Sequence, residues 1–273
     1  MNTGFASLLV FHGSRNRLQY STKVAKLTAL VQKKLWLKNS TDSYSIASSQ
    51  DWVISKTEPS TIAKVSVQST SDLVEAAQLE FAQVELSQQI RDFAQKAIAK
   101  HYQKITIIPV FLSEGVHVKE DIPLAVAEAQ KQLDSKITIE IEDYLGSSPH
   151  LIQLVRQQFW QQKTSQRILL AHGSRLPQGN VAIEHLAQAA NAMVAYWTLQ
   201  PDLTSQIELL ANQNTPSVAI VPYFLFSGKI TEAIASLTNE LQNKFPRTQL
   251  LLGEPLGATP ELAQLIAHQI AQN

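Results

Sequence analysis

Apolar and polar positions follow two alternating patterns along the chain. Short, continuous apolar runs are typical of strands buried on both faces, whereas apolar residues that recur every three or four positions are typical of amphipathic helices. In the first half these patterns predict strands at 7–11, 73–81, 104–112 and 137–141 and helices at 18–37, 86–102, 121–133 and 149–160. Because strands that alternate with helices are joined by right-handed crossovers, we expect an α/β fold with a parallel sheet flanked by helices.

The second half of the chain repeats the first. Three blocks align in the same order: SLLVFHGSR with RILLAHGSR, ITIIPVFLSEG with VAIVPYFLFSG, and DYLGSSPHLIQLV with EPLGATPELAQLI. Further strands are predicted at 167–170 and 218–221, with a helix at 182–193. Matched blocks in one order indicate an internal duplication. We therefore expect two tandem domains, 1–156 and 167–273, each a parallel β-sheet flanked by helices, with their junction at 157–166.

One segment departs from the repeat. Residues 39–63 are rich in Ser and Thr and show no steady period. Clusters of these residues between periodic segments mark loops. We expect a long surface insertion there, which the second half lacks.

The composition excludes several classes of protein. Lys plus Arg balance Asp plus Glu at 23 each, so no overall positive field attracts nucleic acid or an anionic membrane. The absence of cysteine excludes disulfides, thiolate metal ligands, iron–sulfur clusters and thiol nucleophiles. No apolar run approaches the roughly 20 residues of a membrane-spanning helix. We expect a soluble, cytoplasmic protein without a nucleic-acid or membrane partner.

The motif His-Gly-Ser-Arg follows the first predicted strand of each half and begins at His12 and His172. Ligands gather at the carboxyl ends of the strands in open parallel sheets, so both histidines are candidates for chemistry. The alternative is a local turn, in which glycine relieves the backbone and the imidazole bonds nearby. Likewise Ser14 can cap the following helix, or it can join Arg15 in binding an anionic group at the helix start.

The two halves differ after their third strands. His117 follows the strand of the first half, whereas Ile230 stands at the aligned position of the second half. Because the carboxyl ends of parallel strands open onto one edge, His12 and His117 are expected to face each other there. Two neutral imidazoles suit divalent cobalt, iron or nickel, and a two-ligand site leaves coordination positions open. Chance proximity of two unrelated histidines is the alternative.

Glu80 ends the second predicted strand and is placed at the same edge. There it can accept a proton or supply a third, oxygen ligand. The alternative is a solvated surface carboxylate. The segment LEFAQVELSQQI aligns with YWTLQPDLTSQI, which puts Trp197 in the place of Glu80. The second half thus lacks two of the three candidate groups, and a two-histidine site is expected in residues 1–156.

Together these motifs resemble those of the sirohydrochlorin chelatases, the class II chelatases of the CbiX and SirB type. The resemblance rests on His-Gly-Ser-Arg after the first strand, Leu-Glu at the second, and Pro-Val-Phe-Leu-x-x-Gly-x-His-Val-x-x-Asp-Ile-Pro at 109–123. Leu145-Gly146 with Pro149 matches the fourth-strand ending of the family. If the second half is the duplicated copy of the long form, the resemblance spans nearly the whole chain.

The resemblance implies two chelatase-like domains that face each other across a cleft. It also implies that Co²⁺ or Fe²⁺ is inserted as substrate metal into sirohydrochlorin, without ATP or an organic cofactor, in cobalamin or siroheme biosynthesis. By motif, His12 and His117 would handle the metal and accept pyrrole protons, and Glu80 would assist. Ile230 and Trp197 depart from the pattern, so the second half would be a cap without a site of its own. Because a fused pair already supplies both lobes, we expect a monomer.

Sirohydrochlorin carries many carboxylates, which require donors. Ser14, Arg15 and Lys119 are the expected contacts, and Arg175 is a further candidate. Surface solvation is the alternative for Lys119.

Other functions remain open from the sequence. A non-catalytic carrier of a tetrapyrrole or metal would use the same residues. A phosphatase with a histidine nucleophile has arginine before that histidine, where Phe11 stands in this chain. A purely structural role for the duplicated sheet is a further alternative. The choice between cobalt and iron is open as well, because imidazole and carboxylate accept both.

Overall fold

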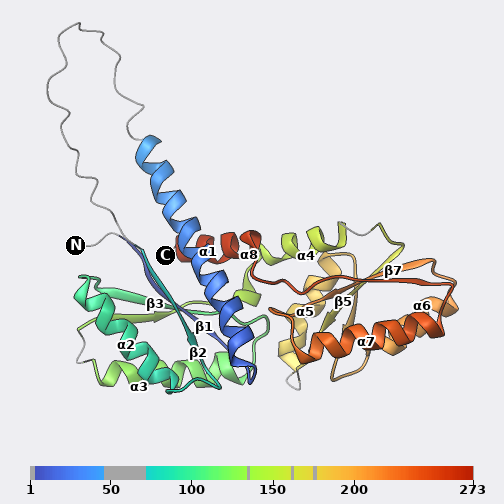
Figure 1. The fold of residues 1–273 in the computed structure, drawn as a ribbon, viewed down its shortest axis with the longest axis horizontal. Helices are drawn as coiled ribbons and strands as arrows, with labels where there is room; N and C mark the ends of the chain where they lie inside the picture. Colours follow the sequence, from blue (N-terminus) through green and yellow to red (C-terminus); the bar gives the residue numbers. More distant parts are fainter. Residues whose placement is uncertain (1–3, 46–71, 134–135, 161–162, 175–176, 273) are drawn as a thin grey trace, which may run out of the picture.

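A computed structural model describes residues 4–45, 72–133, 136–160, 163–174 and 177–272 (Figure 1). Within them lie two parallel four-stranded sheets, which confirms the predicted fold class. The first sheet has the order β2-β1-β3-β4 and consists of β1 (Ala6–Phe11), β2 (Leu73–Gln78), β3 (Lys104–Pro109) and β4 (Thr138–Ile141). The second has the order β6-β5-β7-β8 and consists of β5 (Gln166–Ala171), β6 (Met193–Tyr196), β7 (Ser217–Pro222) and β8 (Gln249–Leu252).

Helices flank both sheets. The first sheet lies between α1 (Arg17–Ser45) on one face and α2 (Leu86–Ala99) with α3 (Ile122–Lys131) on the other. The second sheet packs against α5 (Pro177–Ala189), α6 (Leu203–Asn212) and α7 (Lys229–Lys244). No helix in the described part of the chain is both long and apolar enough to cross a membrane.

The central strand β1 is buried along its whole length. Leu8 and Val10 pack with α2 and α3, whereas Leu9 and Phe11 pack with α1, because successive side chains of a strand point to opposite faces. This two-sided burial explains the continuous apolar run that predicted the strand. It also fixes the carboxyl end of β1 between those of β2 and β3.

The closing helix of each half packs on the other half. Helix α4 (Leu151–Trp160) follows the first sheet but contacts β7, and the Arg156 guanidinium donates a 2.6 Å hydrogen bond to the Ala189 carbonyl at the end of α5. Helix α8 (Pro260–Ile270) follows the second sheet but packs against α1 (Figure 1). The Gln269 side-chain amide donates a 2.6 Å hydrogen bond to the Asp143 carbonyl. One hydrophobic core therefore runs through both halves.

Several boundaries differ from the sequence predictions. The strands expected at 73–81 and 104–112 end at Gln78 and Pro109, and the helix expected at 86–102 ends at Ala99. Helix α1 continues to Ser45, into the segment expected to be an insertion; residues 46–63 of that segment lie outside the described part. Helix α5 begins at Pro177 and ends at Ala189, so the predicted helix at 182–193 was placed several residues too late. Helix α4 continues to Trp160, within the expected junction at 157–166. Periodicity reports which face is buried, and it is weak where a helix end is exposed or a strand is short.

Helix α6 begins with a side-chain cap. The Asp202 carboxylate accepts a 2.8 Å hydrogen bond from the Ser205 backbone N–H, and this bond is the main cause of the lowered pKa of Asp202. Because the pKa is lower in the folded chain, the stabilisation is fully present above the unfolded pKa of about 3.9 and is lost as the pH falls through the folded value.

We expect Asp202→Ala to lower the free energy of unfolding by about 1 kcal/mol at pH 7, because a free N–H remains at the start of α6. Urea denaturation measures this loss. Asp202→Asn keeps an acceptor and should lose less. The difference between Asp202→Ala and the parent protein should shrink as the pH falls through the folded pKa, and a difference that grows there would contradict the capping role.

Candidate metal-handling site

His12 and Glu80 lie side by side where β1 and β2 end. The Glu80 backbone N–H donates a 2.8 Å hydrogen bond to the His12 carbonyl. Gly13 makes this approach possible: its φ is +99°, and a Cβ atom on it would lie 2.0 Å from the Glu80 carbonyl oxygen. Only a residue without a side chain fits between the two loops, which accounts for glycine after the histidine in the motif.

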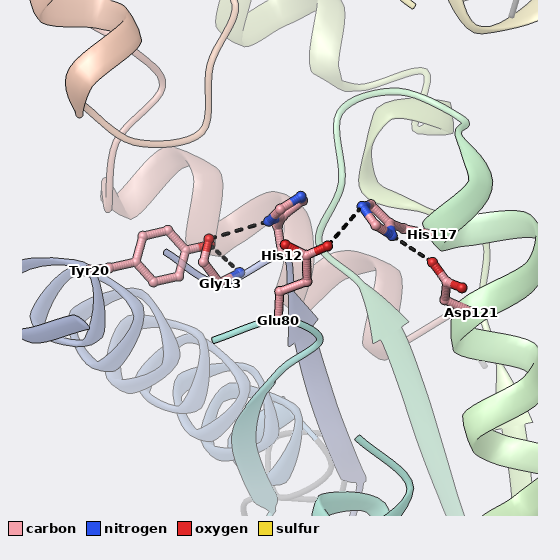
Figure 2. A network of polar contacts seen from close by, with 6 residues as sticks. All are labelled: His12, Gly13, Tyr20, Glu80, His117 and Asp121. Carbon is pink, nitrogen blue, oxygen red and sulfur yellow. Dashed lines mark hydrogen bonds and ion pairs between the residues drawn. The ribbon is translucent and has the colours of Figure 1, made fainter. Parts of the chain in front are cut away.

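His117 reaches the same place from the loop after β3. It is the first residue of a π-helical turn, His117–Asp121, that leads into α3. The ring centroids of His12 and His117 are 4.8 Å apart, with the ring planes nearly perpendicular. The Glu80 Oε1 atom lies 3.9 Å from His117 Nε2 (Figure 2). The three side chains that the sequence singled out therefore meet at one edge of the first sheet.

The three groups have the arrangement of a small metal site. One ligand atom from each of His12, Glu80 and His117 lies within 4.8 Å of the others, and the described residues contain no second group of this kind. His12 is exposed, and the other two side chains are half-buried, so a ligand can reach all three. Two nitrogens and one oxygen suit divalent first-row metals.

An oxygen acceptor lies near the Nδ1 atom of each imidazole and sets the orientation of the ring. His12 Nδ1 lies 3.3 Å from the Gly13 carbonyl oxygen, and His117 Nδ1 lies 2.6 Å from Asp121 Oδ2. Carbonyl and carboxylate oxygens only accept, so Nδ1 carries the proton in each neutral ring and Nε2 carries the lone pair. The sequence analysis included Asp121 only as one residue of the motif at 109–123 and gave it no role in the site. Figure 2 shows this network.

The aromatic ring of Phe111 lies beside both imidazoles. Its centroid is 6.3 Å from that of His12 and 6.1 Å from that of His117. This apolar ring therefore occupies one side of the histidine pair.

The expected substrate anchors make local contacts at the same edge. The Ser14 hydroxyl accepts the Asn16 backbone N–H at 3.3 Å, just before α1 begins. The Arg15 guanidinium lies 5.7 Å from the centre of the Phe81 ring. Contact of Ser14 and Arg15 with a substrate stays a prediction.

Lys119 forms a 3.1 Å ion pair with Glu114 and is exposed. This pairing is compatible with the surface role, and a substrate contact stays a prediction here too. Arg175 lies outside the described residues.

The second half keeps the histidine turn but not its partners. His172 is exposed, and its Nδ1 lies 3.1 Å from the Gly173 carbonyl, as in the first half. The Thr198 backbone N–H, not that of Trp197, bonds the His172 carbonyl, so Thr198 occupies the place of Glu80. The aligned position was therefore wrong by one residue, because the chain between β6 and α6 is shorter. Ile230 packs against the apolar core of the second sheet.

The second half also supports the first-half loops. The Lys23 ammonium donates to the Ser227 carbonyl at 2.9 Å, and the ring of Phe226 packs edge-on against Tyr20 at 5.5 Å. The Tyr20 hydroxyl in turn accepts the Gly13 backbone N–H at 3.3 Å, and burial raises the pKa of this tyrosine. Contacts between the halves thus reach the loop that carries His12.

The loop that carries His117 has a similar contact. The Tyr223 hydroxyl, from the end of β7, donates to the Leu112 carbonyl at 3.3 Å. Tyr223 is buried, and this desolvation raises the pKa of its hydroxyl. Both histidine loops of the first half are therefore held from the second half.

Comparison with known proteins gives related matches. A family model described as CbiX matches the chain twice, over residues 49–162 and 166–273. A sirohydrochlorin ferrochelatase of Priestia megaterium is 23% identical over 186 residues, which cover 61% of this chain and 66% of that protein. A sirohydrochlorin cobaltochelatase of the same organism is 21% identical over 212 residues, which cover 72% of this chain and 68% of that protein. The chain thus spans about two thirds of the length of these relatives.

A solved structure shares the fold. SirB from Bacillus subtilis with Fe³⁺ has a TM-score of 0.72, with 17% sequence identity, over 99% of this chain and 95% of that chain. His12 precedes the first range matched by the family model, so its place beside His117 is known from the structure and not from the match.

Proposed function

The chain belongs to the CbiX family, and from that premise we propose that it inserts Co²⁺ or Fe²⁺ into sirohydrochlorin as a metal chelatase of cobalamin or siroheme biosynthesis. The observation that carries the proposal is the convergence of His12, Glu80 and His117, with one ligand atom of each within 4.8 Å of the others. The printed activities of the two Priestia relatives, a ferrochelatase and a cobaltochelatase, support the substrate class.

The reaction exchanges two ring protons of the macrocycle for one dipositive ion. His12 and His117 would hold the incoming metal through their Nε2 lone pairs, and Glu80 would add an oxygen ligand. Three protein ligands leave coordination positions open, so pyrrole nitrogens can bind before the protein ligands leave. Imidazole and carboxylate also release such metals more readily than the thiolates that this chain lacks.

The same side chains supply the bases. When the metal passes from an imidazole nitrogen to a pyrrole nitrogen, the vacated lone pair accepts the proton that the pyrrole releases. His12 and His117 are suited to this step, because imidazole gains and loses protons near neutral pH. Glu80, 3.9 Å from His117 Nε2, stabilises the imidazolium that forms. Protons and charge then balance, and no nucleotide is consumed.

One chain would supply one site. The second half, with Thr198 and Ile230 at the places of Glu80 and His117, would act as the cap that holds the two histidine loops. Because its contacts with the first half are intramolecular, the proposed working unit is a monomer. Ser14, Arg15 and Lys119 are the proposed contacts for substrate carboxylates.

We expect the protein to catalyse many turnovers when it is mixed anaerobically with sirohydrochlorin and excess Co²⁺ or Fe²⁺. The change in the absorbance of the macrocycle measures insertion, and the same mixture without protein gives the background rate. A single event per protein molecule would identify a carrier instead and would overturn the proposal. Running both metals side by side decides which of them is preferred.

A further inference from the structure

Asp121 makes the shortest polar contact with the candidate site. Its Oδ2 atom lies 2.6 Å from His117 Nδ1, on the side of the ring that faces away from Glu80. Both residues belong to the π-helical turn, in which the Ile122 backbone N–H bonds the His117 carbonyl. Side chains four residues apart on a helix are neighbours, so Asp121 can reach the His117 ring. Figure 2 shows Asp121 and Glu80 on opposite sides of the imidazole.

We propose that Asp121 is a positioning residue, which fixes the tautomer and orientation of His117 so that Nε2 faces His12 and Glu80. A carboxylate has no proton to donate here, so His117 must place its proton on Nδ1 and its lone pair on Nε2. Carboxylates that bind the far nitrogen of a ligating imidazole orient the ring and raise its basicity as a donor. The proposal is tested below by enzyme activity and by the tautomer of His117. The activity measurement rests on the proposed function, whereas the tautomer measurement does not.

The two candidate histidines differ in this respect. His12 has only the neutral Gly13 carbonyl near its Nδ1, at 3.3 Å, whereas His117 has a charged acceptor at 2.6 Å. Hydrogen bonds to charged groups are shorter and stronger than those between neutral groups. His117 is therefore the more tightly oriented ring of the pair.

The second half supports the pairing of these two residues. The sequence alignment that pairs His117 with Ile230 also pairs Asp121 with Ile234. Ile230 and Ile234 lie in α7 and pack against the core of the second sheet, with Ile234 fully buried. The half that has lost the histidine has also lost the carboxylate, as expected if the carboxylate acts only through the ring.

A role for Asp121 as a metal ligand fits less well. The group of ligand atoms within 4.8 Å of one another contains His12, Glu80 and His117 but not Asp121. The carboxylate binds the opposite nitrogen of the imidazole, so it reaches the metal only through His117.

The test compares Asp121→Asn and Asp121→Ala with the matched control Glu120→Gln, which removes an exposed carboxylate from the same turn. We expect both Asp121 variants to lower kcat for metal insertion about 10- to 100-fold with little change in KM for sirohydrochlorin, and Glu120→Gln to change neither. Thermal melts of each variant show that the fold is kept. Unchanged kcat in folded Asp121→Ala would overturn the proposal.

The second readout needs no activity. In protein labelled with ¹⁵N-histidine, we expect the His117 ring to be the Nδ1–H tautomer, and we expect Asp121→Ala to shift it toward Nε2–H or a mixture. Persistence of the Nδ1–H tautomer in both Asp121 variants would overturn the positioning role. If the parent protein shows this tautomer dependence but no turnover, the proposed function fails while the positioning role stands.

Discussion

His12→Ala and His117→Ala should each lower the rate of metal insertion at least about 100-fold, because each removes a proposed metal ligand and a proposed proton acceptor from the same site. Neither ring is part of a hydrophobic core, so both variants should keep the fold. Anaerobic turnover with sirohydrochlorin measures the loss of activity. Direct titration with Co²⁺ should show weaker metal binding in both variants.

The chain contains its own control for this experiment. His172 has the same turn and the same carbonyl contact as His12, but Thr198 and Ile230 stand where the first half has Glu80 and His117. His172→Ala should therefore keep nearly the full insertion rate. If His172→Ala lowered the insertion rate as much as His12→Ala does, the assignment of one site to the first half would be contradicted.

The duplication separates what the fold requires from what the site requires. Both halves keep the strand order, the register and a glycine with positive φ after the histidine. Among the residues that the structure describes, a group of such a turn with a carboxylate and a second imidazole occurs in the first half alone. The shared features are those that bring the ends of the strands together, and the chemistry depends on the residues that differ.

The sequence predicted the parts of this site that depend on local pattern and strand order. Buried apolar runs marked β1 and β3, and the common edge of a parallel sheet brought His12 to His117 although they are distant in the chain. The convergence with Glu80 followed from the same rule. No side-chain geometry was needed for these steps.

Other features depend on contacts that no local pattern reports. Helix α4 contacts β7 and helix α8 contacts α1, so each packs on the other half. The periodicity of a helix shows that it has an apolar face but not which half that face covers. The position of Thr198 depends on the length of the loop between β6 and α6. The hydrogen bond from the Thr198 backbone N–H to the His172 carbonyl shows that position. The spacing of Asp121 from His117 allows a contact, but the 2.6 Å distance between Oδ2 and Nδ1 is known only from the structure.

Gly13→Ala should be among the most destabilising single-methyl changes in the chain. Its Cβ would lie 2.0 Å from the Glu80 carbonyl oxygen, which is backbone and cannot rotate away, and the φ of +99° is strained for alanine. We expect the free energy of unfolding to fall by about 2–4 kcal/mol, from backbone strain and displacement of the loop after β2. Chemical denaturation measures this loss. Because that loop carries Glu80, insertion activity should fall as well.

Two other glycines distinguish this explanation from a general effect of alanine. Gly115→Ala, on the loop that leads to His117, places its Cβ where no atom lies within 4 Å, and stability should change by less than about 0.5 kcal/mol. Gly173 also has a positive φ, which is strained for alanine. The atoms nearest to a Cβ at Gly173 belong to side chains, at 3.2 Å, and these can move. Gly173→Ala should therefore cost less stability than Gly13→Ala and leave insertion intact. Equal losses of activity at Gly13 and Gly173 would show that the close approach of Glu80 to His12 does not set the geometry of the site.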